Sequence, residues 1–292
     1  MCAPIFASVS QTEKEALKAI YYSTNGDNWT NSWDLNTPVK SWYGVTLKND
    51  KVIALDLSFN NVSGTLPNVF DQLNSLEILN LHMNKLCGTI PTSIASISTL
   101  KELNLSFNKI SGNIPDAIGN NSALTHLILF MNQIEGEIPV SIGNASQLEE
   151  ITLFNNRITG GIPSSIGNLS ELKILHVSSN EIQGVIPYEL TKLTKLEVLS
   201  LYDNKMIGRL PTSIGNLNQL TELSLGNNFF SGDIPAEIAN LNKLVTLILS
   251  NNHFNTKFDE RITQIPTLID FKFISSPKVK ASLSIQSAVV SD

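Results

Sequence analysis

The chain has 292 residues, of which 42% are hydrophobic and 16% charged, and this composition excludes an intrinsically disordered chain. Its formal net charge of −6 argues against nucleic acid as a partner, because phosphate binding needs clustered Lys and Arg. The two cysteines, Cys2 and Cys87, form neither a metal-binding nor a redox pattern, and no apolar run has the length of a membrane-spanning helix.

Residues 1–51 precede the regular part of the sequence and are expected to form an N-terminal cap. Thr12 and Glu15 have the spacing of a capping box, which predicts the start of a helix. This helix would bury one apolar stripe, made of Ala16, Leu17, Ile20 and Tyr21. The aromatic cluster that follows is interpreted as a lid over the end of the core rather than a ligand site; it comprises Trp29, Trp33, Trp42 and Tyr43.

An internal repeat of 24 residues occupies residues 52–275 and decides the fold. Asparagine recurs at this spacing nine times, at Asn60, Asn84, Asn108, Asn132, Asn156, Asn180, Asn204, Asn228 and Asn252. In the first eight units, glycine follows the asparagine by four places and proline follows it by seven. In every unit, aliphatic residues precede the asparagine by eight, five and three places.

Each column of the repeat has a physical reason. Aliphatic residues two apart lie on the same side of a short strand, so we expect them to point into the core. The asparagine amide can donate and accept at once, so it can satisfy backbone groups of its own coil and of the neighbouring coil. Glycine permits a tight turn, and Ile142 and Ile166 are expected to face inward from a short helical or 3₁₀ turn. One unit cannot bury its own apolar side, so the units must stack as a solenoid.

The pattern LxxLxLxxNxLxGxIP resembles that of leucine-rich repeats, most closely the 24-residue plant-type subclass, which also occurs in bacterial and protist surface proteins. The resemblance implies an α/β solenoid: a right-handed superhelix with a parallel β-sheet on its concave face and a second, smaller sheet. Residues 25–30 and 42–46 resemble the N-terminal cap of this family. The family's flanking cysteines are replaced here by Lys40 and Leu47, which removes the family's cap disulfide.

The repeat ends before the end of the chain. The ninth unit has Thr256 and Asp259 in place of glycine and proline. A partial tenth strand is predicted at residues 268–273, where Phe271 and Phe273 continue the inward columns with larger side chains. Residues 276–292 follow no repeat and are expected to form a C-terminal tail or cap.

Positions between the inward aliphatic residues are expected to face solvent on the concave side. In the central units several of them are aromatic or apolar, a composition typical of the cores of interfaces. The predicted partner-binding residues are His126, Ile128, Phe130, Met131, Phe154, His176 and Tyr202. An alternative remains for the column directly before the asparagine, in which Phe59, Met83, Phe107 and Met131 would pack against neighbouring coils.

The sequence predicts neither an enzyme nor a cofactor site. His82, His126 and His176 lie on separate units, and coils two apart are about 10 Å apart, too far for shared metal ligands. The acidic residues of the same face are too dispersed for an acid–base pair. The phosphate-binding loop, HExxH and GxSxG motifs are absent.

Three functional hypotheses follow. The first is a non-enzymatic extracellular or cell-surface recognition scaffold, expected to be a monomer, that binds a protein or glycan partner on its concave face. The second, by resemblance to polygalacturonase-inhibiting proteins, is an inhibitor of a secreted polysaccharide-degrading enzyme. The third is ice binding, which occurs in some plant-type repeat proteins and favours a regular array of small residues. The column five places after the asparagine ranks this hypothesis last, because it is irregular and includes Glu137 and Arg209.

Overall fold

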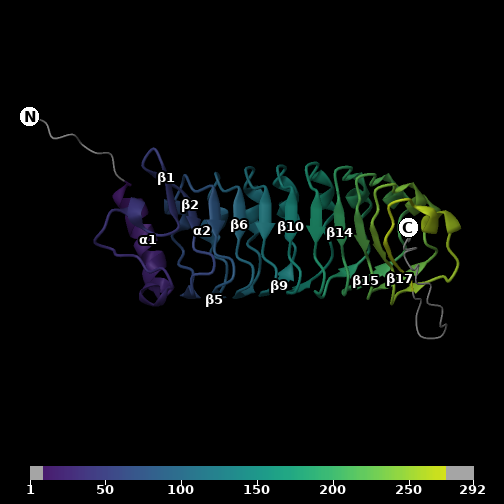
Figure 1. Cartoon of the computed structure of the whole chain (residues 1–292), viewed down its shortest axis with the longest axis horizontal. Helices are drawn as coiled ribbons and strands as arrows, with labels where there is room; N and C mark the ends of the chain where they lie inside the picture. The colour runs from purple at the N-terminus through teal and green to yellow at the C-terminus, as the bar shows by residue number, and fades with distance from the viewer. Residues whose placement is uncertain (1–8, 274–292) are drawn as a thin grey trace, which may run out of the picture.

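The 24-residue units stack into a solenoid in which each unit forms one coil. A computed structural model describes residues 9–273 of the chain. The coils lie side by side from the N-terminal helix α1 to the C-terminal end, and they turn relative to one another along the length (Figure 1). The predicted α/β solenoid with an N-terminal helical cap is confirmed.

The N-terminal helix begins two residues earlier than predicted. The described cap contains α1 (Gln11–Ser23), η1 (Gly26–Asn28), η2 (Val39–Ser41) and β1 (Val45–Lys48). The side chain of Ser10 accepts a hydrogen bond from the Glu13 N–H at 3.2 Å, and the Glu13 carboxylate accepts one from the Ser10 N–H at 3.3 Å. The predicted capping box of Thr12 and Glu15 is therefore wrong. The Ser10–Glu13 and Thr12–Glu15 pairs have the same spacing, but of the two glutamates only Glu13 is buried. Its carboxylate also accepts a hydrogen bond from the N–H of Val52 at 3.1 Å.

The predicted lid covers the first coil. Four residues of α1 predicted to form its apolar stripe are buried: Ala16, Leu17, Ile20 and Tyr21. The rings of Trp29 and Trp33 meet edge to face at 4.9 Å, and Trp33 stacks on Trp42 at 4.8 Å. All three indole N–H groups donate to backbone carbonyls, as burial requires. Tyr43 does not belong to this lid, because its side chain is 47% exposed.

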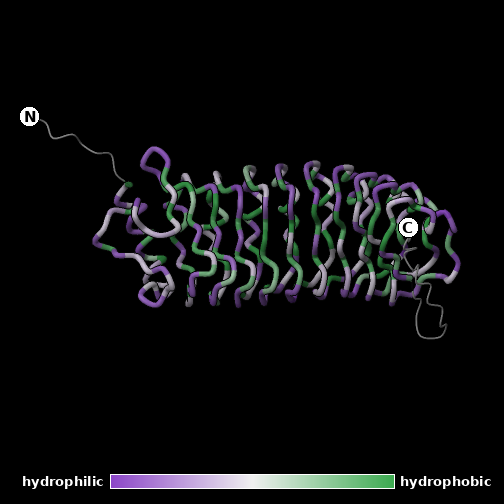
Figure 2. The backbone as a smooth tube through the Cα atoms, in the orientation of Figure 1, coloured by the Kyte–Doolittle hydropathy of each residue, from purple (hydrophilic) through white to green (hydrophobic). Residues whose placement is uncertain are grey.

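The main sheet has eleven strands, which lie in chain order. β1 and β2 form the first pair, and each later coil adds one strand. Only β1 is antiparallel to its neighbour β2; all other pairs are parallel, with residues 24 apart lying opposite each other. After β1 its strands are β2 (Lys51–Asp56), β4 (Ile78–Asn80), β6 (Glu102–Asn104), β8 (His126–Ile128), β10 (Glu150–Thr152), β12 (Ile174–His176), β14 (Val198–Ser200), β16 (Glu222–Ser224), β18 (Thr246–Ile248) and β20 (Asp270–Lys272). The hydrophobic segments recur at the same place in each coil (Figure 2).

Two smaller parallel sheets run along the other side of the coil, with a break after β11. The first contains β3 (Ser63–Thr65), β5 (Lys85–Gly88), β7 (Lys109–Gly112), β9 (Gln133–Glu137) and β11 (Arg157–Thr159). The second contains β13 (Gln183–Gly184), β15 (Lys205–Gly208), β17 (Phe229–Gly232) and β19 (His253–Phe254). Five of these strands end at a glycine with a positive φ, for example +71° at Gly112 in β7, which explains the glycine column.

Short helical turns close the coils. They are η3 (Phe70–Gln72), α2 (Thr92–Ala95), η4 (Asp116–Asn120), η5 (Val140–Asn144), η6 (Ser164–Asn168), η7 (Tyr188–Lys192), η8 (Thr212–Asn216), η9 (Ala236–Asn240) and η10 (Glu260–Gln264). Ile142 in η5 and Ile166 in η6 are buried, as predicted.

The asparagine column holds neighbouring coils together, as predicted. Nδ2 of Asn156 donates to the carbonyl of Leu153 in its own coil at 3.0 Å and to that of Leu129 in the preceding coil at 3.1 Å. Its Oδ1 accepts from the N–H of Ile134 at 2.9 Å. The same three bonds recur at Asn84, Asn108, Asn132, Asn180, Asn204, Asn228 and Asn252. The asparagine side chains therefore satisfy backbone N–H and C=O groups that would otherwise be buried without a hydrogen-bond partner.

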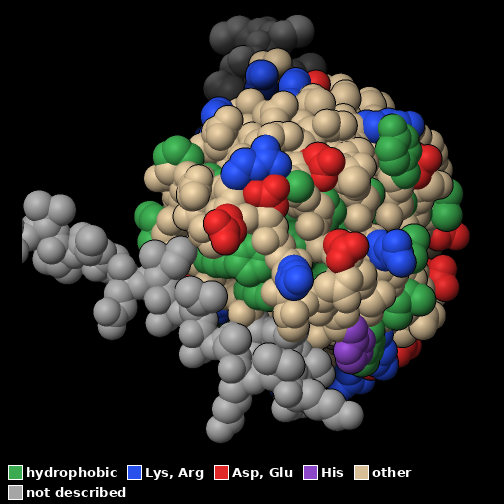
Figure 3. Space-filling view, turned by 90° about the vertical axis from the view of Figure 1, so that its right-hand side faces the viewer, with side chains coloured by type: hydrophobic (Ala, Val, Ile, Leu, Met, Phe, Trp, Pro, Cys, Tyr) green, Lys and Arg blue, Asp and Glu red, His purple; other side chains and the backbone are tan. Residues whose placement is uncertain are grey.

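The C-terminal end of the described chain is closed by aromatic rings. Phe271 in β20 is buried and packs edge to face against Phe258 at 5.5 Å, and Phe258 also meets Phe273 at 5.2 Å. Acidic and basic side chains surround an apolar area on this end (Figure 3). The predicted strand at 268–273 is confirmed as β20, whereas residues 276–292 lie outside the described residues.

Candidate ligand-binding face

The outward-pointing side chains of the eleven-stranded sheet form one surface, here called the sheet face. In strand β8, Leu127 is buried in the core, and the half-buried side chains of His126 and Ile128 flank it on the sheet face. Leu129 returns to the core, which leaves Phe130 on the outer side. The alternation of the strand therefore places the predicted residues on one surface.

Six rings form a continuous row across six coils, here called the aromatic ladder: Phe59, His82, Phe107, Phe130, Phe154 and His176. The N-terminal members meet edge to face, with centroids between 5.0 and 5.5 Å apart. Phe154 stacks on Phe130 at 4.3 Å and on His176 at 4.4 Å. Such contacts are the preferred geometries of aromatic pairs, so the rings hold one another in place.

His82 is fixed in the ladder by a hydrogen-bond chain. The Ser106 hydroxyl donates to Oδ1 of Asn104 at 2.6 Å. Its oxygen also lies 2.7 Å from Nδ1 of His82, within hydrogen-bond distance. The ring orientation of His82 is thus set by the next coil as well as by Phe59 and Phe107.

The column directly before the asparagine adopts a left-handed backbone conformation in every coil. Bulky residues occupy it in the first four coils: Phe59 (φ 53°), Met83 (φ 51°), Phe107 (φ 54°) and Met131 (φ 55°). Later coils have Asn155, Ser179, Asp203, Asn227 and Asn251 there. These bulky residues are between 36% and 63% exposed, yet the rings of Phe59 and Phe107 contact rings of neighbouring coils, as the alternative predicted. Bulky side chains are costly in this conformation, by about 1–2 kcal/mol each, so exposed Phe and Met are unexpected on stability grounds.

A hollow of about 330 Å³ opens in the sheet face where the ladder ends. It is lined by His176, Ser178, Ser200, Tyr202, Ser224, Ile248, Ser250 and Lys272. Asn227 donates to the Tyr202 hydroxyl at 2.7 Å, which leaves the hydroxyl hydrogen of Tyr202 free to point elsewhere. A larger hollow of about 700 Å³, between Asn113–Asp116 and Gly136–Ser141, lies at the turns of two coils and contains no aromatic ring.

Burial controls the charge of His176. Partial desolvation lowers its pKa below the ordinary value of 6.5, and the nearby carboxylate of Glu150 opposes this effect. The imidazole at the junction of ladder and hollow is therefore neutral at pH 7. A neutral ring stacks on Phe154 without the cost of burying a charge.

The structure brings most of the predicted residues together. Phe130, Phe154 and His176 belong to the aromatic ladder, and Tyr202 lines the hollow together with His176. His126 stays apart: its Nδ1 is 2.8 Å from the Thr125 hydroxyl, and within residues 9–273 its ring joins no aromatic pair.

Sequence reasoning missed part of the surface. It placed Phe59, His82 and Phe107 on this face but did not connect them to the predicted patch. Phe59 and Phe107 lie one place before the asparagine and His82 two places before, so the row changes column from coil to coil. The serine-lined hollow was missed as well. Its signal was the serines two or four places before the asparagine in the last four units: Ser178, Ser200, Ser224 and Ser250.

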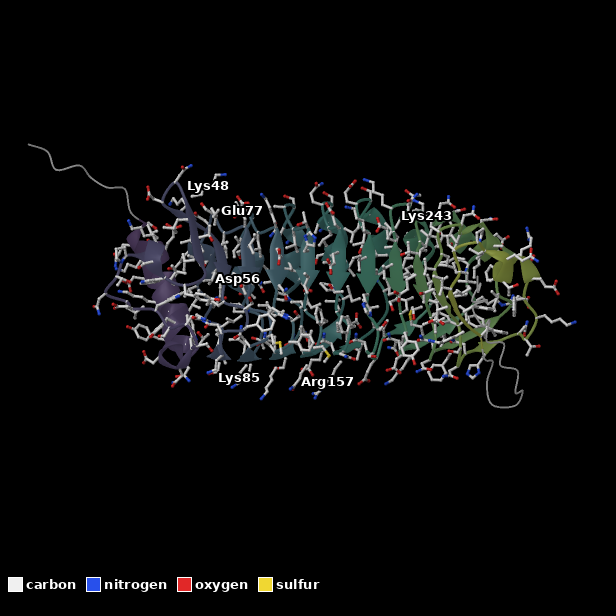
Figure 4. All side chains as sticks on the ribbon, in the orientation of Figure 1. Lys48, Asp56, Glu77, Lys85, Arg157 and Lys243 are labelled. Carbon is white, nitrogen blue, oxygen red and sulfur yellow. The ribbon has the colours of Figure 1, made fainter. Side chains whose placement is uncertain are left out.

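Charged side chains occupy the two long rims of the solenoid rather than the ladder. Glu77 and Lys243 lie along one rim, and Lys85 and Arg157 project from the other (Figure 4). Ion pairs join adjacent coils, as between Lys101 and Glu77 at 2.7 Å, where the ammonium group lowers the pKa of the Glu77 carboxyl. In residues 9–273 no group of three or more His, Cys, Asp or Glu side chains could hold a metal ion. No helix in the same range is long and apolar enough to cross a membrane.

Profiles of the leucine-rich-repeat family match residues 146–206 and four single repeats, at residues 51–73, 75–97, 99–121 and 219–241. Together these ranges cover more than half of the chain. The chain belongs to the leucine-rich-repeat family. Its 24-residue unit is the plant type, as the resemblance implied. A comparison of this sequence with curated proteins found no match.

Solved structures of leucine-rich-repeat ectodomains resemble this repeat protein. One is the ectodomain of the receptor kinase GASSHO1/SCHENGEN3 from Arabidopsis thaliana in complex with CASPARIAN STRIP INTEGRITY FACTOR 2, with 31% identity, a TM-score of 0.84, and coverage of 89% of this chain and 32% of that one. Another is the Arabidopsis receptor kinase HAESA in complex with the peptide hormone IDA and the co-receptor SERK1, with 35% identity, a TM-score of 0.66, and coverage of 71% and 35%. The leucine-rich-repeat chain described here thus spans about a third of the length of these ectodomains.

A plant ice-binding protein has the same fold over its whole length. It is 24% identical, with a TM-score of 0.68, and the match covers 90% of this chain and 94% of that protein. At this identity the likeness concerns the leucine-rich-repeat architecture alone.

Proposed function

We propose that this leucine-rich-repeat chain is an extracellular or cell-surface recognition scaffold that binds an extended peptide along the aromatic ladder. The observation that carries the proposal is the unbroken row of six rings on a solvent-facing sheet. Monomeric proteins rarely expose a contiguous apolar surface of this kind unless it binds something. Aromatic and Met side chains are also the residues most enriched in the cores of interfaces.

The dimensions of the ladder suit an extended chain. Adjacent parallel strands are about 4.8 Å apart, so the five steps from Phe59 to His176 span roughly 24 Å. An extended peptide rises about 3.3 Å per residue, so about seven residues would follow the ladder. Alternate side chains of such a peptide could contact the rings, while the others would face solvent.

The relatives support a peptide rather than a glycan. The two ectodomain structures above contain CASPARIAN STRIP INTEGRITY FACTOR 2 and the peptide hormone IDA, respectively. The rigid ladder also favours binding, because rings that already contact each other lose little conformational freedom on complex formation.

Selection from a library of displayed random peptides tests the proposal. The intact chain is compared with a triple variant, Phe130→Ala, Phe154→Ala and Tyr202→Ala. A matched control removes three exposed residues from outside the sheet face: Val140→Ala, Val185→Ala and Tyr188→Ala. Circular dichroism and thermal unfolding check that all three proteins are folded.

We expect the control to bind the selected peptides as the intact chain does. The triple variant should lose at least about 100-fold in affinity. Truncating the two ladder residues, Phe130 and Phe154, is enough for this, because two central interface residues together contribute more than about 2.8 kcal/mol. Equal binding by the triple variant would refute the ladder as the binding surface. Selection of oligosaccharides from a glycan array, with no peptide selected, would refute the peptide as its ligand.

A further inference from the structure

One coil has no side chain at the position next to the lining residues of the hollow. Gly226 stands two places before its asparagine, where the other coils have Ser, His, Phe or Tyr. Its φ is not in the left-handed region, so the backbone does not require glycine at this place. A Cβ atom on Gly226 would lie 3.0 Å from the Ile248 side chain and 3.1 Å from the Tyr202 ring. A side chain at this place would therefore crowd Ile248, Tyr202 and the Ser250 carbonyl, three residues that line the hollow.

Hydroxyl groups form the floor of this hollow. Ser178 and Ser200 are buried and share a hydrogen bond of 2.9 Å. Ser224 is only 3% exposed, and its hydroxyl has no hydrogen-bond partner in the described residues. Every fully enclosed polar side-chain atom of the described residues does have a partner, so the Ser224 hydroxyl must open into the hollow. An unpaired hydroxyl at this depth is a group that a ligand can satisfy.

The walls of the hollow are flat and uncharged. His176 and Tyr202 contribute rings, and Ile248 contributes an aliphatic surface. Among the described residues, Lys272 is the one charged residue of the lining, and its ammonium group is already paired with Asp270 at 3.1 Å. The imidazole is neutral at pH 7, as argued above. A charged ligand would therefore be desolvated here without a free counter-charge, which is unfavourable.

We propose that this hollow binds a single neutral polyhydroxylated ring, such as the sugar ring of a monosaccharide unit. Serine hydroxyls donate and accept, so they can match sugar hydroxyls of either orientation. The ring faces of His176 and Tyr202 provide apolar surface for the C–H side of a sugar. The volume of about 330 Å³ lies at the lower end of the range for small-molecule sites, as expected for one ring rather than a longer chain.

The sugar site goes beyond peptide binding by the ladder. The two sites share His176 and Tyr202 as a common border, but Ser200 and Ser224 belong to the hollow alone. A free sugar can therefore occupy the hollow whether or not a peptide binds the ladder.

Saturation-transfer NMR with small sugars tests the site directly. The probes are the methyl glycosides of glucose, galactose, mannose, xylose and N-acetylglucosamine, each at about 10 mM, since a single ring binding with roughly 4 kcal/mol has a Kd near 1 mM. Methyl sulfate and inorganic phosphate serve as charged probes. The proteins are the intact chain, Gly226→Ala, Ser224→Ala, and the control Ser58→Ala, which changes the same repeat column as Gly226 in the first coil.

We expect at least one neutral glycoside to bind the intact chain and the Ser58→Ala control. Gly226→Ala, whose methyl group would crowd the lining side chains of Tyr202 and Ile248, and Ser224→Ala, which removes the unpaired hydroxyl, should each weaken binding at least tenfold. If Gly226→Ala fails to fold, Ser224→Ala still decides the test. Absence of binding by every glycoside, preference for the charged probes, or equal binding by the folded variants would each overturn the proposal.

A second arm identifies the source of the sugar. Peptides selected on the ladder are compared with the same peptides carrying one sugar on a serine. Tighter binding of the glycopeptide by the intact chain, lost in Ser224→Ala, would assign a peptide-borne sugar; equal binding would assign a free glycan. If the intact chain binds a sugar but binds no peptide, the ladder proposal is refuted and the sugar site stands.

Discussion

Phe130 and Phe154 lie face to face, with ring centroids 4.3 Å apart and ring planes within 12° of each other, although they are 24 residues apart in the chain. The exact period of the repeat puts equivalent positions of neighbouring coils side by side. A solenoid can therefore build a continuous recognition surface from residues that each belong to a different unit.

Phe154 should contribute to stability as well as to binding, because it stacks on rings of both neighbouring coils. We expect Phe154→Ala to lower the free energy of unfolding by roughly 1–3 kcal/mol, since each aromatic pair contributes about 0.5–1.5 kcal/mol beyond its buried area. Phe154→Tyr keeps both stacks and should change it little. Urea unfolding followed by circular dichroism measures both, and unchanged stability of Phe154→Ala would show that the stacks are loose.

The asparagine column should be far less tolerant than its neighbour in sequence. Asn156→Ala would leave the carbonyls of Leu129 and Leu153 and the N–H of Ile134 without their partner, so we expect a loss of about 3 kcal/mol or more. Asn155→Gly should stay within about 0.5 kcal/mol, because glycine readily adopts its φ of 53°. Thermal unfolding distinguishes the two. Equal effects would mean that the asparagine bonds do not hold the coils together.

The left-handed column predicts a stabilising substitution. Met83 is 50% exposed at a φ of 51°, a conformation that asparagine adopts with less strain. We expect Met83→Asn to raise the free energy of unfolding by roughly 1 kcal/mol while weakening peptide binding. A stabilised variant with full binding would indicate that Met83 is not part of the surface. A destabilised variant would indicate that its backbone is not strained.

His176 should make stability depend on pH in a defined window. Its pKa in the folded protein is lowered by burial, whereas in the unfolded chain it has the ordinary value of 6.5. At pH values between these two pKa values, the unfolded chain binds more protons than the folded protein. The contribution of His176 to stability is therefore complete above pH 6.5 and is lost as the pH falls through the pKa of the folded state. Glu150 is the charged group that faces it and limits the size of this effect.

His176→Phe keeps a ring in the stack and removes the titration. Urea unfolding of both proteins between pH 5 and pH 8 should show a smaller loss on acidification for the variant. Identical curves, or an imidazole that titrates above 6.5 by NMR, would contradict the assignment of a neutral buried ring.

Much of the fold follows from the sequence because the repeat constrains every coil in the same way. The aliphatic columns, the asparagine bonds and the glycine turns each depend on neighbours at a fixed spacing, so one unit predicts the next. The capping box was misplaced because Ser10–Glu13 and Thr12–Glu15 share one spacing, and only the burial of Glu13 against the first coil distinguishes them.

The binding surface was less predictable because side-chain direction, not spacing, decides it. Phe59 and Phe107 join a ladder with His82 only because the left-handed backbone turns them toward its ring. The hollow is lined largely by serines of successive coils, which a search for aromatic side chains overlooks.

The methionines offer the most direct test of the central claim, that the sheet face binds the ligand through the aromatic ladder. Met83 and Met131 lie exposed beside the ladder, whereas Met206 is buried in the core. In a protein with ¹³C-labelled methionine methyl groups, we expect a selected peptide to shift the Met83 and Met131 resonances in proportion to occupancy and to leave Met206 in place. A saturating peptide that leaves both Met83 and Met131 unshifted would contradict the account.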